Sequence, residues 1–218
     1  MNDKLIYKYL GYKGNIPDEN VLNIIKLCKQ EVLENENSGY VYKVFDIEFK
    51  EDSVEVLGTN LSLTGKSITN HLKGCNAVIL LCATLGMQVD KYIKLCELKD
   101  MSKALIADSV ASVRIDDFCD DIETELKEKY KDMYFTYRFG LGYGDLPLKL
   151  EPIFLNILDA GKVIGVTTNE SFLLTPRKSV ACVIGLSKNP LDKKSRGCVT
   201  CNMKDVCQYR ADGGHCGF

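Results

Sequence analysis

The chain has 218 residues, of which 45% are hydrophobic and 27% charged, and its formal net charge is −2. This length and apolar content predict a well-packed domain and argue against a disordered chain. The nearly balanced charge offers no basic surface for nucleic acid, and a count of two histidines argues against histidine-based acid–base catalysis.

No targeting segment or membrane span is predicted. The N-terminal residues lack the basic start and apolar stretch of a signal peptide. The most apolar run, residues 77–85, is far shorter than the roughly 20 residues that cross a bilayer. We therefore expect a cytoplasmic protein whose ten cysteines serve as thiols or metal ligands rather than as disulfides.

Hydrophobic periodicity predicts the elements of the first half of the chain. A helical repeat of apolar residues begins after Pro17 and Asp18, and alternating apolar and charged residues then favour a β-hairpin. A continuous apolar run predicts a strand that is buried on both faces. The predicted elements are a helix at 18–35, a hairpin at 40–50 and 53–57, a short helix at 67–72, a buried strand at 77–83 and a helix through Cys96.

Gly65, Lys66 and Ser67 resemble the end of a nucleotide-binding P-loop. That motif requires an earlier glycine at position 60, and Asn60 occupies this position instead. We therefore interpret the three residues as the start of the short helix, with His71 exposed on its surface.

The second half contains the longest helical pattern, in which apolar residues form one stripe. A β-rich run, a glycine loop and a further helix follow, and Gly161 is expected to end that helix. The predicted elements are helices at 102–131 and 148–160 and strands at 133–137, 163–168, 172–174 and 179–184. Because helices and strands do not alternate as repeated βαβ units, we predict an α+β fold.

The segment from Arg138 to Pro147, Arg-Phe-Gly-Leu-Gly-Tyr-Gly-Asp-Leu-Pro, is the strongest candidate for a functional surface. Its glycines allow left-handed backbone conformations and a close approach to a ligand. Arg138 offers a planar set of donors for a carboxylate or phosphate, and Tyr143 offers an aromatic ring with a polar end. The glycine spacing differs from the G-x-G-x-x-G of dinucleotide-binding folds, which leaves a ligand-binding loop or a simple tight turn.

The order Arg138-x-x-x-Gly142-Tyr143 resembles the R-x-x-x-G-Y motif in the activation domain of cobalamin-dependent methionine synthase. Further likeness to stand-alone bacterial versions of that domain covers residues 144–148, 164–171 and 176–180, and more weakly residues 9–14. The resemblance implies a single curved domain in which helices pack around a twisted antiparallel sheet. It places this domain at residues 1–187, before a linker and a cysteine-rich tail at residues 188–218.

The resemblance implies a free-standing module that binds S-adenosylmethionine and docks on a separate corrinoid protein. There, cobalamin held by a methionine synthase or another corrinoid methyltransferase would be reductively methylated, with an electron donor such as flavodoxin. The chain would be a methyltransferase component acting in trans, mostly by positioning and without a catalytic base. The residues expected to contact S-adenosylmethionine are Asp116, Asp132, Arg138, Gly140, Leu141, Gly142 and Tyr143.

The two acids in this set are placed by their positions relative to the family pattern. Asp116 belongs to a run with Asp117, Asp120 and Asp121 in the long helix, and Asp132 precedes the arginine by six residues. A carboxylate here would suit the cationic amino group of S-adenosylmethionine. The alternative interpretation is that the aspartate run forms a solvated helix face.

Four cysteines crowd the last 21 residues of the chain: Cys198, Cys201, Cys207 and Cys216. Neighbouring thiolates can share a metal, so the set predicts zinc or an iron–sulfur cluster, with free thiols or a redox pair as the alternative. A cluster would allow the chain to pass the electron that reductive methylation requires. Cys28, Cys82 and Cys182 lie within apolar patterns and are predicted to be core residues.

Two other functions fit the sequence. One is a metal-cluster electron carrier or reductive activator of a corrinoid protein, for which the main fold is a docking platform. The other is a non-catalytic partner that stabilises a corrinoid protein without binding S-adenosylmethionine. Iron content and a redox-active spectrum would favour the first, and co-purification without ligand binding would favour the second.

Overall fold

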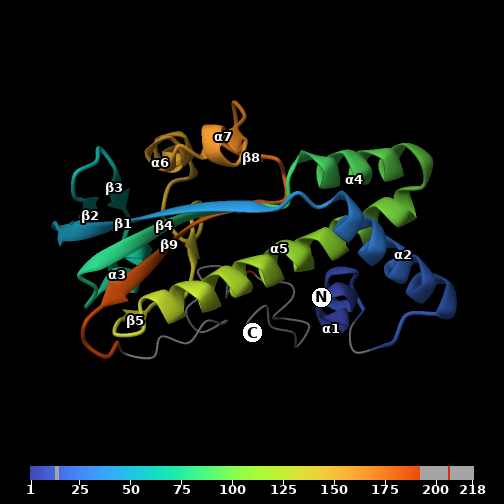
Figure 1. Cartoon of the computed structure of the whole chain (residues 1–218), viewed down its shortest axis with the longest axis horizontal. Helices are drawn as coiled ribbons and strands as arrows, with labels where there is room; N and C mark the ends of the chain where they lie inside the picture. The colour runs from blue at the N-terminus through green and yellow to red at the C-terminus, as the bar shows by residue number, and fades with distance from the viewer. Residues whose placement is uncertain (13–14, 192–205, 207–218) are drawn as a thin grey trace.

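The structure is a computed structural model that describes residues 1–12, 15–191 and 206. The helices are α1 (Asp3–Tyr9), α2 (Glu19–Asn35), α3 (Lys66–Leu72), α4 (Met87–Lys99), α5 (Met101–Lys129), the 3-10 helix η1 (Leu148–Leu150), α6 (Glu151–Leu158) and α7 (Ala160–Val163). The strands are β1 (Gly39–Phe49), β2 (Ser53–Val56), β3 (Ser62–Thr64), β4 (Ala77–Thr84), β5 (Tyr134–Phe135), β6 (Phe139–Gly140), β7 (Thr167–Thr168), β8 (Leu174–Thr175) and β9 (Ser179–Ser187). The fold is α+β, as predicted, with an antiparallel sheet and helices packed around it (Figure 1).

The large sheet has the strand order β3-β2-β1-β4-β9-β5, and β6 also pairs with β9. β1 serves two antiparallel partners, because its residues 39–46 pair with β4 and its residues 47–49 pair with β2. β9 pairs with β4 along one side and with the short strands β5 and β6 along the other. The segment between β5 and β6 therefore lies at the edge of the sheet, beside β9.

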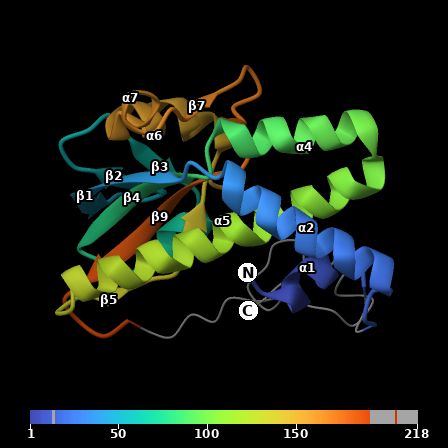
Figure 2. The same cartoon turned by 45° about the vertical axis from the view of Figure 1, so that its right-hand side comes forward.

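β4 separates two hydrophobic cores, because its side chains alternate between the faces of the sheet. Ile79 and Leu81 enter the core formed with α2, α4 and α5, whereas Val78 and Leu80 enter the core formed with α3 and α6. Every residue of β4 is buried, as the continuous apolar run predicts. Figures 1 and 2 show α5 along one face of the sheet, and α6 and α7 on the opposite face.

The elements before the glycine loop agree closely with the sequence prediction. Asp18 caps α2 because its side chain accepts the backbone N–H of Val21 at 2.9 Å. Both the β1–β2 hairpin and the short helix α3 are present. α1 is an additional helix that the periodicity did not predict. In the part of the chain that the structure describes, no helix combines the length and apolar character of a membrane span.

The region after the glycine loop departs from the predicted single helix at 148–160. Asp159 adopts a left-handed conformation, with φ of 56°, and separates α6 from α7. Gly161 lies inside α7 and does not end the helix there. Because α7 continues to Val163, the predicted strand at 163–168 shortens to β7, which pairs with β8 in a separate two-stranded sheet.

The proposed division of the chain falls where β9 ends, at Ser187. The linker and tail predicted at residues 188–218 lie almost entirely outside the described residues. The division into a domain and a tail therefore stays a prediction.

Candidate functional site

The predicted site begins at the sheet edge, where successive side chains point to opposite faces. The rings of Tyr137 and Phe139 pack on His71 of α3, at centroid distances of 4.4 and 4.9 Å. Arg138 lies between them in sequence and extends to α5. His71 is only 3% exposed, so the prediction that it lies on the surface is wrong, because the two rings cover it.

Arg138 contacts two carboxylates that are three residues apart on α5. Its Nη1 lies 2.7 Å from Oε1 of Glu123, and its Nη2 lies 2.8 Å from Oδ1 of Asp120. The side chain of Arg138 is 12% exposed. Burial opposes the charge on the guanidinium, but the neighbouring carboxylates, Glu123 first, outweigh burial and raise the pKa of Arg138. The arginine is therefore held as a cation close to the interior.

Asp116 lies one turn before Asp120 on the same helix. Its Oδ2 accepts a hydrogen bond of 3.3 Å from the hydroxyl of Tyr9 at the end of α1. Burial raises the pKa of Asp116, and the positive charge of Arg138 acts in the opposite direction. The fold thus brings Asp116 into the electrostatic neighbourhood of Arg138, together with a tyrosine that the sequence analysis did not single out.

The glycine loop is a compact turn with one exposed aromatic ring. Gly142 has φ of 81°, and its N–H donates to the carbonyl of Leu146 at 3.0 Å. Leu141 and Leu146 are buried in the core beneath α6, which anchors the loop at both ends. Tyr143 is 70% exposed. The loop therefore presents backbone and a single large ring to solvent from a fixed base.

Gly140 is needed where it stands because the ring of Tyr143 folds back over it. A Cβ added at position 140 would lie 2.8 Å from Cδ2 of Tyr143, which is closer than such atoms normally approach. The N–H of Tyr143 also donates to the carbonyl of Gly140 at 3.3 Å. A side chain at position 140 would consequently displace the ring.

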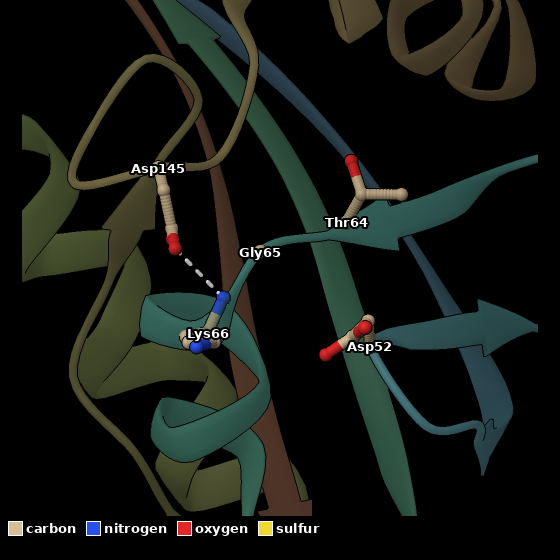
Figure 3. Close-up of a pocket in the computed structure, with 5 residues that line it drawn as sticks. All are labelled: Asp52, Thr64, Gly65, Lys66 and Asp145. Atoms are coloured by element: carbon tan, nitrogen blue, oxygen red, sulfur yellow. Dashed lines mark hydrogen bonds between the residues drawn. The ribbon is translucent and has the colours of Figure 1, made fainter.

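Asp145 has a structural role that the sequence analysis missed. Its Oδ2 accepts the backbone N–H of Lys66 at 2.8 Å (Figure 3). Its Oδ1 accepts the backbone N–H of Ser67 at 2.9 Å. Burial alone would raise the pKa of Asp145, but the hydrogen bonds from Ser67 and Lys66 outweigh it and lower the pKa. The signal in the sequence was Gly65, which precedes α3 and has no side chain to cap it.

A shallow pocket of about 450 Å³ lies beside this cap, lined by Asp52, Thr64, Gly65, Lys66 and Asp145 (Figure 3). The backbone N–H groups of Lys66 and Ser67 at the start of α3 already donate to the carboxylate of Asp145. This agrees with the interpretation of Gly-Lys-Ser as a helix start, since those donors are already in use.

Glu151 is a second residue that sequence reasoning missed. It occupies the first turn of α6, is 3% exposed, and burial raises its pKa to about 8. Among the described residues, its Oε2 has no hydrogen-bond partner. A buried carboxyl that accepts no hydrogen bond at one oxygen is favoured in its neutral, protonated form.

The remaining predicted residues are Asp132 and the tail cysteines. Asp132 is exposed in the turn between α5 and β5. The predicted metal ligands Cys198, Cys201, Cys207 and Cys216 lie outside the described residues. Within the described ranges, no group of three or more potential ligands could hold a metal ion. The predicted core residues Cys28, Cys82 and Cys182 are buried, which confirms that prediction.

Two sequence comparisons give no match: no family model fits the chain, and no curated protein matches it. Comparison of structures does give a match. The α+β domain that carries the glycine loop has the fold of a known class of domain, the methionine synthase reactivation domain. The solved structure described as the MetH reactivation domain bound to AdoHcy matches with a TM-score of 0.66 and 14% identity, over 95% of this chain and 80% of that one. The predicted activation-domain fold is thereby confirmed.

Proposed function

We propose that the chain binds S-adenosylmethionine at the sheet edge beside β9 and serves as a reactivation module for a separate cobalamin protein. The observation that carries this proposal is the position of Arg138, within 2.8 Å of carboxylates on α5 and next to the glycine loop. The same fold has been solved as a domain bound to AdoHcy. The methionine portion of S-adenosylmethionine has a carboxylate and an ammonium on one carbon, so adjacent cationic and anionic side chains suit it.

In this proposal each part of the cluster contacts a different part of the ligand. Arg138 binds the carboxylate of the methionine portion, and Asp116 accepts the ammonium. The backbone of Gly140, Leu141 and Gly142 lies along the same portion, where glycines permit a close approach. Tyr143, with its exposed ring, faces the corrin of the docked partner. The role of Asp132 near the ligand rests on the family resemblance. Titration of an Asp132→Asn variant with S-adenosylmethionine tests it separately.

The chemistry proposed for the chain is positioning. When S-adenosylmethionine is bound, its sulfonium supplies an already activated methyl group. The partner's cob(I)alamin supplies the electron pair for the new cobalt–carbon bond, and S-adenosylhomocysteine leaves with the electrons of the broken carbon–sulfur bond. No proton moves, so the chain needs no base, and its residues orient the ligand. One electron must first reduce cob(II)alamin, and it comes from a donor such as flavodoxin in the cytoplasm.

Calorimetric titration of S-adenosylmethionine into the purified chain tests the proposal. We expect the native chain to bind and Arg138→Ala to lose binding. Arg177→Ala is the matched control, because Arg177 is 65% exposed and pairs with Glu97 and Asp108 away from the loop. A folded native chain that binds neither S-adenosylmethionine nor S-adenosylhomocysteine would contradict the proposal.

We further propose that the tail cysteines hold zinc or an iron–sulfur cluster and that a cluster passes an electron to the partner. The support is the density of thiols in the sequence. Anaerobic purification followed by metal analysis and visible spectroscopy tests this, with serine replacing each of Cys198, Cys201, Cys207 and Cys216. A native chain without iron, zinc or visible absorbance would remove the tail from the mechanism.

A further inference from the structure

The two carboxylates that hold Arg138 differ sharply in exposure. The side chain of Glu123 is 11% exposed and that of Asp120 is 69% exposed, although both lie within 2.8 Å of the guanidinium. Glu123 also receives an ion pair from Lys127 at 3.1 Å, one turn further along α5. One partner of the arginine is thus enclosed and held from two sides, and the other faces solvent.

We propose that Glu123 is a positioning residue that permanently holds Nη1 of Arg138, and that Asp120 is an exchangeable partner whose place at Nη2 is taken by the carboxylate of the ligand. This inference rests on the proposed function, because it names how the same site admits S-adenosylmethionine. Asp120 then acts as an internal competitor: it occupies the carboxylate position until a ligand arrives.

The physical basis is the difference between buried and exposed ion pairs. An exposed carboxylate gains little from its pair, because water and salt screen the charges and its rotamers stay accessible. A buried carboxylate that lost its arginine would be left desolvated and uncompensated. Exchange at Asp120 therefore costs little, whereas exchange at Glu123 is strongly disfavoured. Nη2 is thus the side of the guanidinium that a ligand reaches.

The geometry also assigns the ammonium to Asp116 rather than to Asp120. Asp116 already accepts a hydrogen bond from the hydroxyl of Tyr9 and is more buried than Asp120, so it stays in place when Asp120 is displaced. A ligand whose carboxylate takes Nη2 would then direct its ammonium toward Asp116, which lies one helical turn before Asp120 on α5. The released Asp120 side chain turns to solvent.

The test compares two ligands on matched variants. The ligands are S-adenosylmethionine and its decarboxylated analogue, which keeps the amine and sulfonium but lacks the carboxylate. The variants are Asp120→Asn and the control Asp121→Asn, which removes a similarly exposed carboxylate from the next position of α5. For each protein, calorimetry gives the dissociation constant of the decarboxylated analogue divided by that of S-adenosylmethionine. This ratio measures the preference for a ligand that has the carboxylate.

We expect Asp120→Asn to tighten S-adenosylmethionine binding by about three- to fivefold, because an internal competitor of modest strength is removed. The affinity for the decarboxylated analogue should stay unchanged or fall, so the ratio rises. Asp121→Asn should leave the ratio as it is in the native chain. Loss of affinity for both ligands in Asp120→Asn would overturn the inference, since it would mean that Asp120 binds the ammonium.

The variant Glu123→Gln tests the other half of the inference. Without a fixed Nη1, the arginine should lose its preference for the carboxylate, so the ratio should fall toward one while circular dichroism shows a folded chain. An unchanged ratio in both Asp120→Asn and Glu123→Gln would refute the exchange. If the native chain binds neither ligand, the proposed function itself fails, and the two failures are therefore distinguishable.

Discussion

Arg138 and the start of α3 are two places where the chain gathers donors for an anion, and they are used differently. At α3, one carboxylate of Asp145 takes two backbone N–H groups at 2.8 and 2.9 Å. At Arg138, the donors are divided between an enclosed acid and an exposed one. The helix start is closed by a loop residue, whereas the guanidinium keeps one side next to solvent.

This difference shows that a group of hydrogen-bond donors is a candidate binding site for an anion only when the carboxylate of the chain that already accepts from it can be displaced. The backbone around Asp145 is fixed by the hydrogen bond from the N–H of Leu146 to the carbonyl of Tyr143 and by the burial of Leu146, so its carboxylate is held at the start of α3. Asp120 extends from a long helix that would not change if its side chain rotated. The Gly-Lys-Ser pattern and the arginine look similar as anion motifs, yet we assign ligand binding only to the arginine.

The largest expected effect follows from removing the shared donor. Arg138→Ala removes the buried cation of Glu123 and leaves it only the exposed Lys127, and a broken buried pair typically costs about 3–5 kcal/mol of unfolding free energy. Urea unfolding of the variant measures this. The double variant Arg138→Ala with Glu123→Ala should recover part of the loss, because no unpaired charge remains. Equal losses in the single and double variants would contradict a buried ion pair.

The next effect concerns Glu151, which follows the loop and lacks the donors that Asp145 has. Its pKa is raised from 4.5 to about 8, so between these values the folded chain retains a proton that the unfolded chain releases. Stability should therefore fall as pH rises through this window. Relative to Glu151→Gln, the native chain should lose about 2–3 kcal/mol between pH 5 and 7.

Urea unfolding of native and Glu151→Gln chains at several pH values checks this expectation. Glu128→Gln is the control, because Glu128 is an exposed carboxylate on α5. The free energy of unfolding of Glu128→Gln should change with pH in the same way as that of the native chain. Parallel stability curves for native and Glu151→Gln would show that Glu151 is ionised in the folded state.

A smaller effect is expected when the cap of α3 is removed. Asp145→Ala should cost about 1–2 kcal/mol, the upper part of the usual range for a lost N-terminal helix cap, because two N–H groups lose their acceptor. Because the pKa of Asp145 is lowered, this contribution is present above its unfolded pKa and is lost as pH falls through the folded pKa. Asp52→Ala, which changes the same pocket but not the cap, should have little effect in thermal unfolding. An unchanged affinity for S-adenosylmethionine in Asp145→Ala would show that the start of α3 takes no part in ligand binding.

The smallest effect is expected at Gly140. An alanine there should push the ring of Tyr143 off its present position, at a cost of about 1 kcal/mol. Gly161→Ala is the matched control, since an added Cβ there meets its nearest atom at an ordinary 3.7 Å. NMR signals of the Tyr143 ring, assigned by comparison with a Tyr143→Phe variant, and ligand titration check the outcome. A displaced ring with unchanged S-adenosylmethionine affinity would assign Tyr143 to the partner rather than to the ligand.

Strong periodic patterns made most of the fold predictable. The unbroken apolar run of β4 and the long stripe of α5 each allowed one interpretation, and both elements are present. The break at Asp159 was not predictable, because Gly161 was the more obvious helix stop and aspartate adopts left-handed conformations less often than glycine. His71 was misplaced because no local pattern shows that residues 66 and 68 positions later will cover it.

The site was predictable where a motif fixes its backbone and less so where the fold supplies partners. Arg138 and the glycine loop could be chosen from spacing alone. A run of acids on α5 did not reveal which carboxylate reaches the arginine, and Glu123 was never a candidate, because helix orientation at the sheet edge decides this. Tyr9 approaches Asp116 only because α1 packs on α5, across 107 residues of sequence.

The position of β9 has a consequence for how the site comes into being. Ser179 pairs with Thr84, and β5, which precedes the glycine loop, pairs with β9, which follows it in the chain. Such distant pairings slow folding, because a large loop must close before any contact is gained. The arginine and its loop are synthesised well before their supporting strand, so ligand binding should be the last property to appear as the chain folds.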